Sequence, residues 1–175
     1  MDTIENILTR RSIRKFTGEP VAEEQLHTML RTGFSAPSAK NTRPWQFLVI
    51  RSPQTLQAIT KVHPFSSMLP EAGCGVLICG DATANDNQGY LLQDCSAAME
   101  NMLLAAHALG LGAVWLGVAP REERIAALRE LLSIPEHSHP MALMALGHPA
   151  EERPAPDRYD AAKVFYERWG TKEDI

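Results

Sequence analysis

The sequence predicts one α+β domain, arranged as a three-layer α/β/α sandwich with helices on both faces of a sheet. Helical segments outnumber strand segments, and helices separate the strands along the chain. The 175 residues suit a single domain, because a domain of about 150 residues buries roughly 70% of the surface that its unfolded chain exposes. We find no internal repeat and no second domain, so residues 1–175 are expected to form one unit.

A short helix opens the chain and a second one follows a break. Asp2 and Glu5 have the spacing of a helix-capping pair, and apolar residues then recur at helical spacing up to a basic stretch at 10–15. The glycine and proline at 18–20 interrupt the chain. A new apolar stripe then predicts a helix at about 22–35.

An irregular segment at 36–44 precedes the first strand. It contains two prolines and several small polar residues, so it fits neither a helix nor a strand. We expect a loop that presents polar groups directly before an apolar strand at 45–50. Ser52 and Pro53 then have the pattern of an N-cap and a first helical residue, which predicts a third helix ending near Val62.

The middle of the chain contains a buried strand and the strongest helix signal. A loop is expected at 63–70, a continuous apolar strand at 75–80 and a polar connection at 81–88. The helix predicted at 94–109 is apolar on nearly every side, and Gly110 ends it. In a domain of this size, such a helix indicates a subunit interface as well as a core.

The last strands flank a further helix, and a tail follows them. A buried strand is expected at 113–118, and Gly117 lies within it, where a glycine often marks a bulge or the close approach of a ligand. A helix at 120–132 and a strand at 141–146 complete the compact part. The segment at 150–175 begins with charges and prolines and ends with aromatic residues, which indicates a tail that docks elsewhere.

Composition and charge argue against several classes of protein. The net charge is -4, and the basic excess is confined to one short stretch, whereas a nucleic-acid-binding protein normally carries a broad basic face. No apolar run is long enough to span a bilayer, and residues 1–6 carry two acids where a signal peptide needs bases. We therefore expect a cytoplasmic protein that binds neither nucleic acid nor membrane.

The cysteines and histidines give no sign of a disulfide framework or a metal site. Cys74, Cys79 and Cys95 form no C-x-x-C pair, so buried thiols are expected. His137 and His139 flank a serine, but a metal site needs further ligands nearby. We expect no metal.

The basic stretch allows two interpretations. Arg10, Arg11, Ser12, Arg14 and Lys15 crowd positive charge into a chain that is acidic overall. They form either a solvated surface loop or a phosphate site, since arginine donates paired hydrogen bonds to phosphate oxygens. No glycine-rich loop accompanies them, so a phosphate would be held by side chains rather than by backbone amides.

Taken together, the motifs resemble those of the FMN-dependent nitroreductase family. Four stretches carry the resemblance: R-R-S-I-R at 10–14, A-P-S-A-K-N-T-R-P-W-Q-F at 36–47, the run from D-C-S-A-A-M-E-N to G-A-V-W-L-G at 94–117, and G-H-P with R-Y-D at 147–160. They span nearly the whole chain. The resemblance implies a nitroreductase-like fold and an interlocked homodimer with two flavins at the interface. It also implies that the tail at 150–175 docks on the partner subunit.

The resemblance also implies which residues bind FMN. One subunit would hold the phosphate and ribityl end through Arg10, Arg11, Ser12 and Arg158, and Arg14 would face the N1/O2 edge of the ring. Leu116 and Gly117 would bring backbone close to N5 and O4. The residues expected from the other subunit are Pro37, Ser38, Ala39 and Asn41.

In this interpretation FMN carries the chemistry, and no side chain acts as a catalytic residue. FMN would pass hydride from NAD(P)H to a small acceptor, such as a nitroaromatic compound or a quinone, with ping-pong kinetics. His63, Phe65, Met68 and Tyr90 are candidates for the substrate-side wall and equally for ordinary packing. The alternatives are flavin or enone reduction, a flavin-binding sensor or storage protein, and a basic loop without a ligand.

Overall fold

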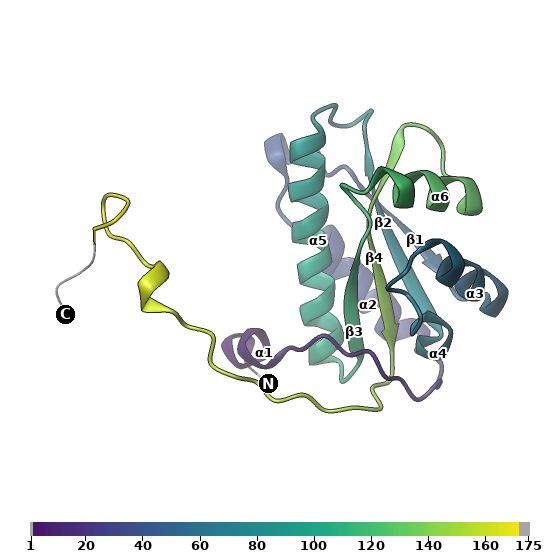
Figure 1. Cartoon of the computed structure of the whole chain (residues 1–175), viewed down its shortest axis with the longest axis horizontal. Coiled ribbons are helices and arrows are strands. Elements are labelled where there is room, and N and C mark those ends of the chain that lie inside the picture. The colour runs from purple at the N-terminus through teal and green to yellow at the C-terminus, as the bar shows by residue number, and fades with distance from the viewer. Residues whose placement is uncertain (1, 172–175) are drawn as a thin grey trace.

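The computed structural model describes residues 2–171 of the chain. The α-helices are Thr3–Thr9 (α1), Glu23–Phe34 (α2), Pro53–Val62 (α3), Leu69–Ala72 (α4), Gln88–Ala108 (α5) and Glu122–Leu132 (α6). The strands are Trp45–Ile50 (β1), Cys74–Asp81 (β2), Gly112–Gly117 (β3) and Ser138–Gly147 (β4), and two 3-10 turns occupy Ala39–Asn41 (η1) and Ala161–Lys163 (η2). Figure 1 shows these elements.

The four strands form one sheet in the order β1-β2-β4-β3, and all neighbouring strands are antiparallel. β2 and β4 lie in the centre and are buried along nearly their whole length, as their continuous apolar sequences require. The edge strand β3 gains a short parallel bridge from the N-terminal segment, between Ser12 and Ala113.

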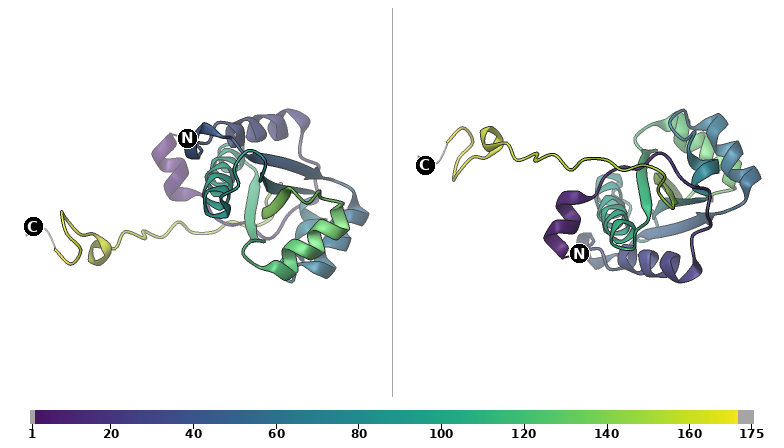
Figure 2. Two further views of the ribbon diagram at one scale, coloured as in Figure 1. Left: turned by 90° about the horizontal axis from the view of Figure 1, so that it is seen from above. Right: turned by 90° about the horizontal axis from the view of Figure 1, so that it is seen from below.

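Helices cover both faces of the sheet, which confirms the predicted α+β three-layer fold. α2 and α5 pack on one face, and α3, α4 and α6 pack on the other (Figures 1 and 2). The strands supply both cores by alternation: Val76 and Ile78 face α5, whereas Leu77 between them faces the opposite layer.

The strand predictions are largely confirmed. The strand at 45–50 coincides with β1, the predictions at 75–80 and 141–146 lie inside β2 and β4, and the one at 113–118 is displaced by one residue from β3. β4 begins earlier than predicted, at Ser138, and its extra residues pair with the end of β2 beyond a register shift.

Two helix predictions and one loop prediction are wrong in their extent. α5 begins at Gln88 rather than at 94, because the side chain of Asn87 caps the helix by accepting a hydrogen bond from the Tyr90 N–H (3.1 Å). α6 begins at Glu122 rather than at 120. The loop predicted at 63–70 ends in the short helix α4, which begins at Leu69.

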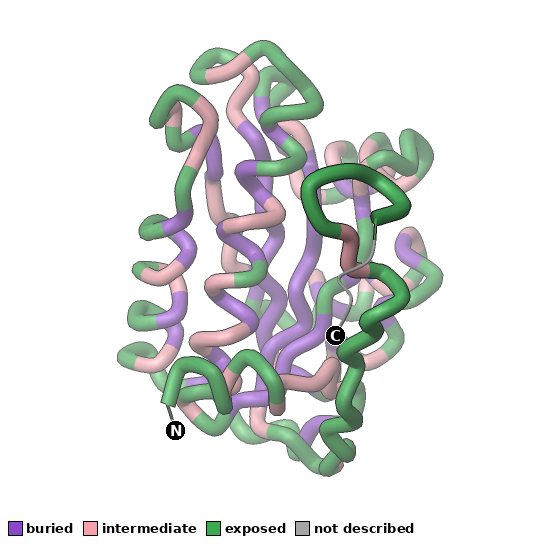
Figure 3. The backbone as a smooth tube through the Cα atoms, turned by 90° about the vertical axis from the view of Figure 1, so that its left-hand side faces the viewer, coloured by how far each residue is buried: buried purple, intermediate pink, exposed green. Residues whose placement is uncertain are grey.

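Within one chain, α5 is not buried all round. Residues such as Ala98 and Met102 lie in the core, whereas Leu92, Glu100 and Ala108 are exposed (Figure 3). The helix therefore has an exposed face with apolar residues that this chain leaves uncovered. The subunit interface predicted on this helix stays a prediction.

The segment that follows β4 leaves the body of the molecule. It extends away from the helices and the sheet, and it ends in a small turn structure around η2 (Figures 1 and 2). There Phe165 and Trp169 contact each other with ring centroids 4.4 Å apart, while Trp169 remains 90% exposed. No helix among residues 2–171 is long and apolar enough to cross a membrane.

Candidate functional site

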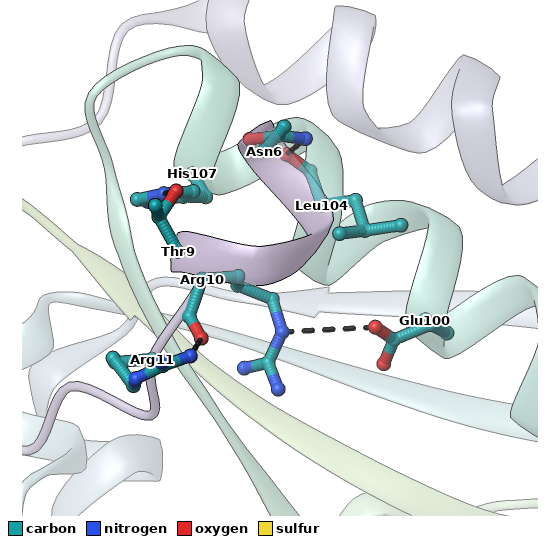
Figure 4. Close-up of polar contacts among 7 residues, drawn as sticks. All are labelled: Asn6, Thr9, Arg10, Arg11, Glu100, Leu104 and His107. Carbon is teal, nitrogen blue, oxygen red and sulfur yellow. Dashed lines mark hydrogen bonds and ion pairs between the residues drawn. The ribbon is translucent and has the colours of Figure 1, made fainter. Parts of the chain in front are cut away.

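The basic stretch runs along the free edge of β3. Its residues leave α1, and the Ile13 N–H donates to the carbonyl of Ala113 (3.0 Å). α1 itself is fastened to α5, because Asn6 donates to the Leu104 carbonyl (3.0 Å) and Thr9 is hydrogen-bonded to His107 (3.0 Å; Figure 4). The arginines are thus held between α5 and the sheet edge.

Arg10 and Arg11 make different contacts. The Nε of Arg10 lies 3.6 Å from a carboxylate oxygen of Glu100 (Figure 4). Arg11 donates from Nε to the carbonyl of Pro154 at the start of the tail (2.9 Å). Its Nη2 is buried and has no hydrogen-bond partner among residues 2–171, so this guanidinium retains a donor for an anion.

Three of the predicted arginines come together in one cleft. Arg10, Arg11 and Arg158 all line a cleft of about 630 Å³, together with Glu100 and Tyr159. A cleft of this size suits a small-molecule ligand. Its three guanidiniums outnumber the two carboxylates, those of Glu100 and Asp157, so the cleft favours a ligand that carries negative charge.

A second cleft adjoins the first. It measures about 540 Å³ and shares Thr9, Arg11 and Ala155 with the first cleft. It also contains His107, whose pKa is lowered by burial and by the positive charges of Arg10 and Arg11. Burial is the larger cause, and the charges of Arg10 and Arg11 add to it because they disfavour a positive charge on the imidazole ring.

Ser12 and Arg14 lie further along the same edge. Ser12 is half-buried in its bridge to Ala113. Arg14 is exposed, and its backbone N–H donates to the Oε1 atom of Glu151 (2.6 Å). This hydrogen bond is the main reason why the pKa of Glu151 is lowered. The contact ties the start of the tail to the basic stretch.

The predicted loop residues lie elsewhere in the same chain. Ala39 donates from its backbone N–H to the Oδ1 of Asp94 (2.9 Å), which is on α5 and only 5% exposed. Asp94 and Leu104, which contacts α1, are ten residues apart, so the loop and the arginines are separated by about 15 Å along α5. A single chain therefore does not bring Pro37–Asn41 beside the arginine cleft.

The loop itself has an unusual backbone. Lys40, Asn41 and Arg43 all have positive φ angles of about 50°. The hydroxyl of Ser38 accepts a hydrogen bond from the Arg43 N–H (2.9 Å), which closes the turn. Pro37 and Asn41 are exposed, so the turn presents them to the surroundings.

Gly117 lies at the opposite end of β3 from the arginines. A Cβ added at Gly117 would meet nothing within 4 Å, whereas one at Gly112 would lie 2.8 Å from Ile13. Gly112 is thus required by packing, and Gly117 instead borders open space. Leu116 is buried in the core with its side chain in the layer of α3 and α6. Its predicted role as a cofactor contact stays a prediction.

The four candidates for the substrate-side wall are dispersed. His63 is 1% exposed and cannot line an open surface, and Met68 packs partly buried against the core of α3 and α6. Phe65 and Tyr90 are exposed. The structure instead gives His63 a role that sequence reasoning missed, because its Nε2 is 3.0 Å from the carbonyl oxygen of Gly117.

Two more residues were missed, and both are acids. Asp94 anchors the loop, and Glu100 contacts Arg10. Both stand out in the sequence as the rare acidic residues of a helix that is otherwise mostly apolar. No cluster of three or more potential metal ligands occurs within residues 2–171.

Comparison with known proteins gives a consistent result. The model of the nitroreductase family matches residues 7–68 and 62–148. A protein of Methanothermobacter thermautotrophicus that carries the provisional name NADH dehydrogenase/NAD(P)H nitroreductase is 44% identical over 169 residues, covering 97% of this chain and 88% of the relative. The NADPH-flavin oxidoreductase of Vibrio harveyi is 30% identical over 178 residues, covering 95% of this chain and 73% of the relative.

Solved structures share the fold over nearly the full chain. A provisionally named NADH dehydrogenase/NAD(P)H nitroreductase from Parabacteroides distasonis superposes with a TM-score of 0.92 at 35% identity, covering 95% of this chain and 98% of that one. A provisionally named nitroreductase from Desulfovibrio desulfuricans, solved in complex with FMN, gives a TM-score of 0.83 at 34% identity, covering 97% and 99%.

Proposed function

The chain belongs to the nitroreductase family, and we propose that it is an FMN-dependent oxidoreductase that takes electrons from NAD(P)H and reduces a small organic acceptor. One observation carries the proposal. The three arginines that sequence reasoning assigned to a phosphate line a single cleft at one end of β3, and Gly117 borders open space at the other end.

The residues present fit FMN. Ala113 and Gly117 are four residues apart, which corresponds to about 13 Å along a strand. An elongated ligand with a phosphate at one end and a ring at the other suits this separation. The buried Nη2 of Arg11 has no partner among the described residues, so it can donate to a phosphate oxygen.

We assign the residues of one chain as follows. Arg10, Arg11 and Arg158 would hold the phosphate, with Ser12 beside the ribityl chain. Arg14 would face the N1/O2 edge of the ring, where a fixed cation stabilises the negative charge of the reduced flavin. Gly117 would allow the ring to approach the backbone, because it has no side chain to obstruct that approach.

We further propose that two chains share each site. The turn at 36–44 lies away from the arginine cleft of its own chain, which fits a role in the partner's site. The residues of this turn that would contact the partner's flavin are Pro37, Ser38, Ala39 and Asn41. Ile4 and Leu8 on α1 are exposed, and so is the apolar side of α5. The tail at 150–175 would dock on the partner and bury its aromatic residues.

When bound, FMN supplies the redox chemistry, taking a hydride from NAD(P)H and giving it to the acceptor. The protein's part is to bind, orient and tune the ring. If reductant and acceptor occupy the same place in turn, the kinetics are ping-pong. The open space beside Gly117 suits flat acceptors such as nitroaromatic compounds and quinones.

The proposal is tested by an absorbance spectrum of the freshly purified chain, followed by anaerobic addition of NADH or NADPH and then of an acceptor. We expect a yellow protein that is bleached by reductant and regains colour with a nitroaromatic compound or a quinone. A protein that stays colourless after incubation with FMN and desalting contradicts the proposal. A yellow protein that no reductant bleaches would instead be a flavin-binding sensor or storage protein.

A further inference from the structure

His63 is buried directly beneath the open end of β3. It follows α3, is 1% exposed, and its Nε2 lies 3.0 Å from the carbonyl oxygen of Gly117. A second contact fixes the arrangement of its protons. The Phe65 N–H donates to Nδ1 of His63 (3.3 Å), so Nδ1 is the acceptor and Nε2 carries the proton that is donated to Gly117.

A second donor, from a different helix, reaches the same carbonyl. Arg124, on α6, donates from Nη1 to the oxygen of Gly117 (2.8 Å). Its guanidinium also lies over the ring of Phe65, 5.3 Å from the ring centroid. The pKa of His63 is lowered, first by burial and also by the charge of Arg124, so the ring is neutral at neutral pH.

His63 and Arg124 together form a clamp on the carbonyl of Gly117, the residue of β3 whose backbone most needs restraint. A glycine loses more conformational freedom on folding than any other residue, and this one stands at the end of an edge strand with open space beside it. Two donors on one carbonyl, one from the segment after α3 and one from α6, fix the direction of the peptide that follows Gly117.

The alternation of the strand shows where the other backbone group of Gly117 points. The carbonyl of Ala113 faces the free edge of β3, where it accepts from Ile13. Gly117 is four residues further on and so directs its N–H and C=O to the same edge. The carbonyl is occupied by the clamp, and the N–H remains directed to the edge along which the ligand is proposed to lie.

We infer that His63 is a positioning residue for the flavin ring, acting with Arg124 through the carbonyl of Gly117. This inference rests on the proposed function. His63 touches neither flavin nor substrate. By holding the carbonyl of Gly117, it restrains the backbone of this residue and so the direction in which the Gly117 N–H points towards the ring. A donor directed at the ring stabilises the negative charge that reduction adds to the flavin. If the Gly117 N–H is held less firmly, this stabilisation weakens and the midpoint potential of the flavin falls.

The experiment compares His63→Leu and His63→Gln in the FMN-loaded full-length protein. Glutamine keeps a donor at about the position of Nε2, and leucine does not. For His63→Leu we expect the Kd for FMN to rise about five- to tenfold, the visible absorption band to shift and the midpoint potential to fall. His63→Gln should restore affinity to within about twofold of the unmodified protein.

Arg10→Ala serves as the matched control, because it acts at the phosphate end. It should weaken FMN binding while leaving the potential and the absorption band of the bound flavin unchanged. Arg124→Met removes the other donor from a partly exposed position, so it gives a folded variant should His63→Leu fail to fold. It should shift the band and the potential in the same direction as His63→Leu.

The outcomes distinguish a failure of the positioning role of His63 from a failure of the proposed FMN-dependent function. If the unmodified protein does not bind FMN, the proposed function fails. If it binds FMN and Arg124→Met leaves affinity, band and potential unchanged, the positioning role is overturned. The role is equally overturned if His63→Gln is as impaired as His63→Leu, because the Nε2 donor would then not matter.

Discussion

Arg10 has a carboxylate partner in the protein and, under the proposed function, a phosphate partner in the ligand. Its pairing with Glu100 joins side chains that are 22% and 48% exposed, and exposed ion pairs contribute only about 0–1 kcal/mol to stability. A bound phosphate would accept a charge-assisted hydrogen bond worth about 1.5–3 kcal/mol. The arginine therefore matters more for binding than for folding.

Arg10→Ala and Glu100→Gln should consequently change FMN affinity in opposite directions. Arg10→Ala is expected to weaken binding about ten- to a hundredfold with little change in melting temperature. Glu100→Gln removes a negative charge from the arginine cleft, so it should tighten binding. Fluorescence titration of the apoprotein with FMN measures both effects. Full retention of flavin on dilution by both Arg10→Ala and Arg158→Ala would show that the phosphate lies elsewhere.

His63 also predicts how stability depends on pH. Its pKa is lowered in the folded protein from its ordinary value of 6.5, so the unfolded chain binds the proton more readily. The stabilisation is therefore complete above pH 6.5 and is lost as the pH falls towards the folded-state pKa. His107 shifts in the same direction and contributes to the same window.

Urea unfolding of the apoprotein between about pH 7.5 and pH 5 measures this dependence. The free energy of unfolding should fall as the pH decreases, and His63→Gln should flatten the curve. A comparison with His107→Gln divides the effect between the two histidines. An unfolding free energy that is constant over this range would contradict the buried neutral state of His63.

At the scale of elements, the loop at 36–44 depends on one contact with α5. Three of its residues have left-handed backbone angles, which are unfavourable for most residues other than glycine. Asp94 compensates by accepting the Ala39 N–H at 2.9 Å. The anchor fixes the turn that is proposed to reach the partner's flavin.

Asp94→Ala should therefore loosen the loop more than the helix that carries it. Losing a buried charge-assisted hydrogen bond costs about 1.5–3 kcal/mol. Hydrogen exchange should increase at the amides of 38–43, while those in the middle of α5 remain protected. Asp94→Asn keeps an acceptor oxygen and is the matched control. If exchange in the loop is the same for alanine and aspartate, the anchor is not needed.

Sequence reasoning located elements where one periodic signal dominates. The strands are short apolar runs, and each was found to within a few residues. The start of α5 was missed because Gln88–Gln93 mixes polar and apolar residues, and the cap at Asn87 was overlooked. The hydrogen bond between His63 and Gly117 connects residues that are 54 apart in the chain, and no local sequence pattern encodes such a contact.

At the scale of the whole molecule, one chain leaves apolar surface uncovered. Leu8 on α1 is exposed, and so is Leu92 on α5. The tail carries further aromatic residues away from the body of the molecule (Figure 1). Within the same chain the loop at 36–44 lies far from the arginine cleft along α5. Both observations favour a dimer in which each flavin contacts both chains.

Mixing two inactive variants tests this sharing of the site. Arg14→Glu damages the contribution of one chain, and Asn41→Asp damages the contribution proposed for the other. A heterodimer of the two variants then has one site with both lesions and one site with neither. After unfolding and refolding of an equal mixture, random pairing leaves about a quarter of all sites intact, so activity should reappear at roughly that level.

The control is a chain that carries both substitutions and is refolded alone, because every site in its dimer is damaged and no activity should return. Native mass spectrometry of the mixture establishes that heterodimers have formed. Should those heterodimers be as inactive as their parents, Arg14 and Asn41 would act from the same chain. The stiff turn at 36–44 would then serve its own subunit, even in a protein that binds FMN, and its distance from the arginines along α5 would have to be closed by a movement of the loop.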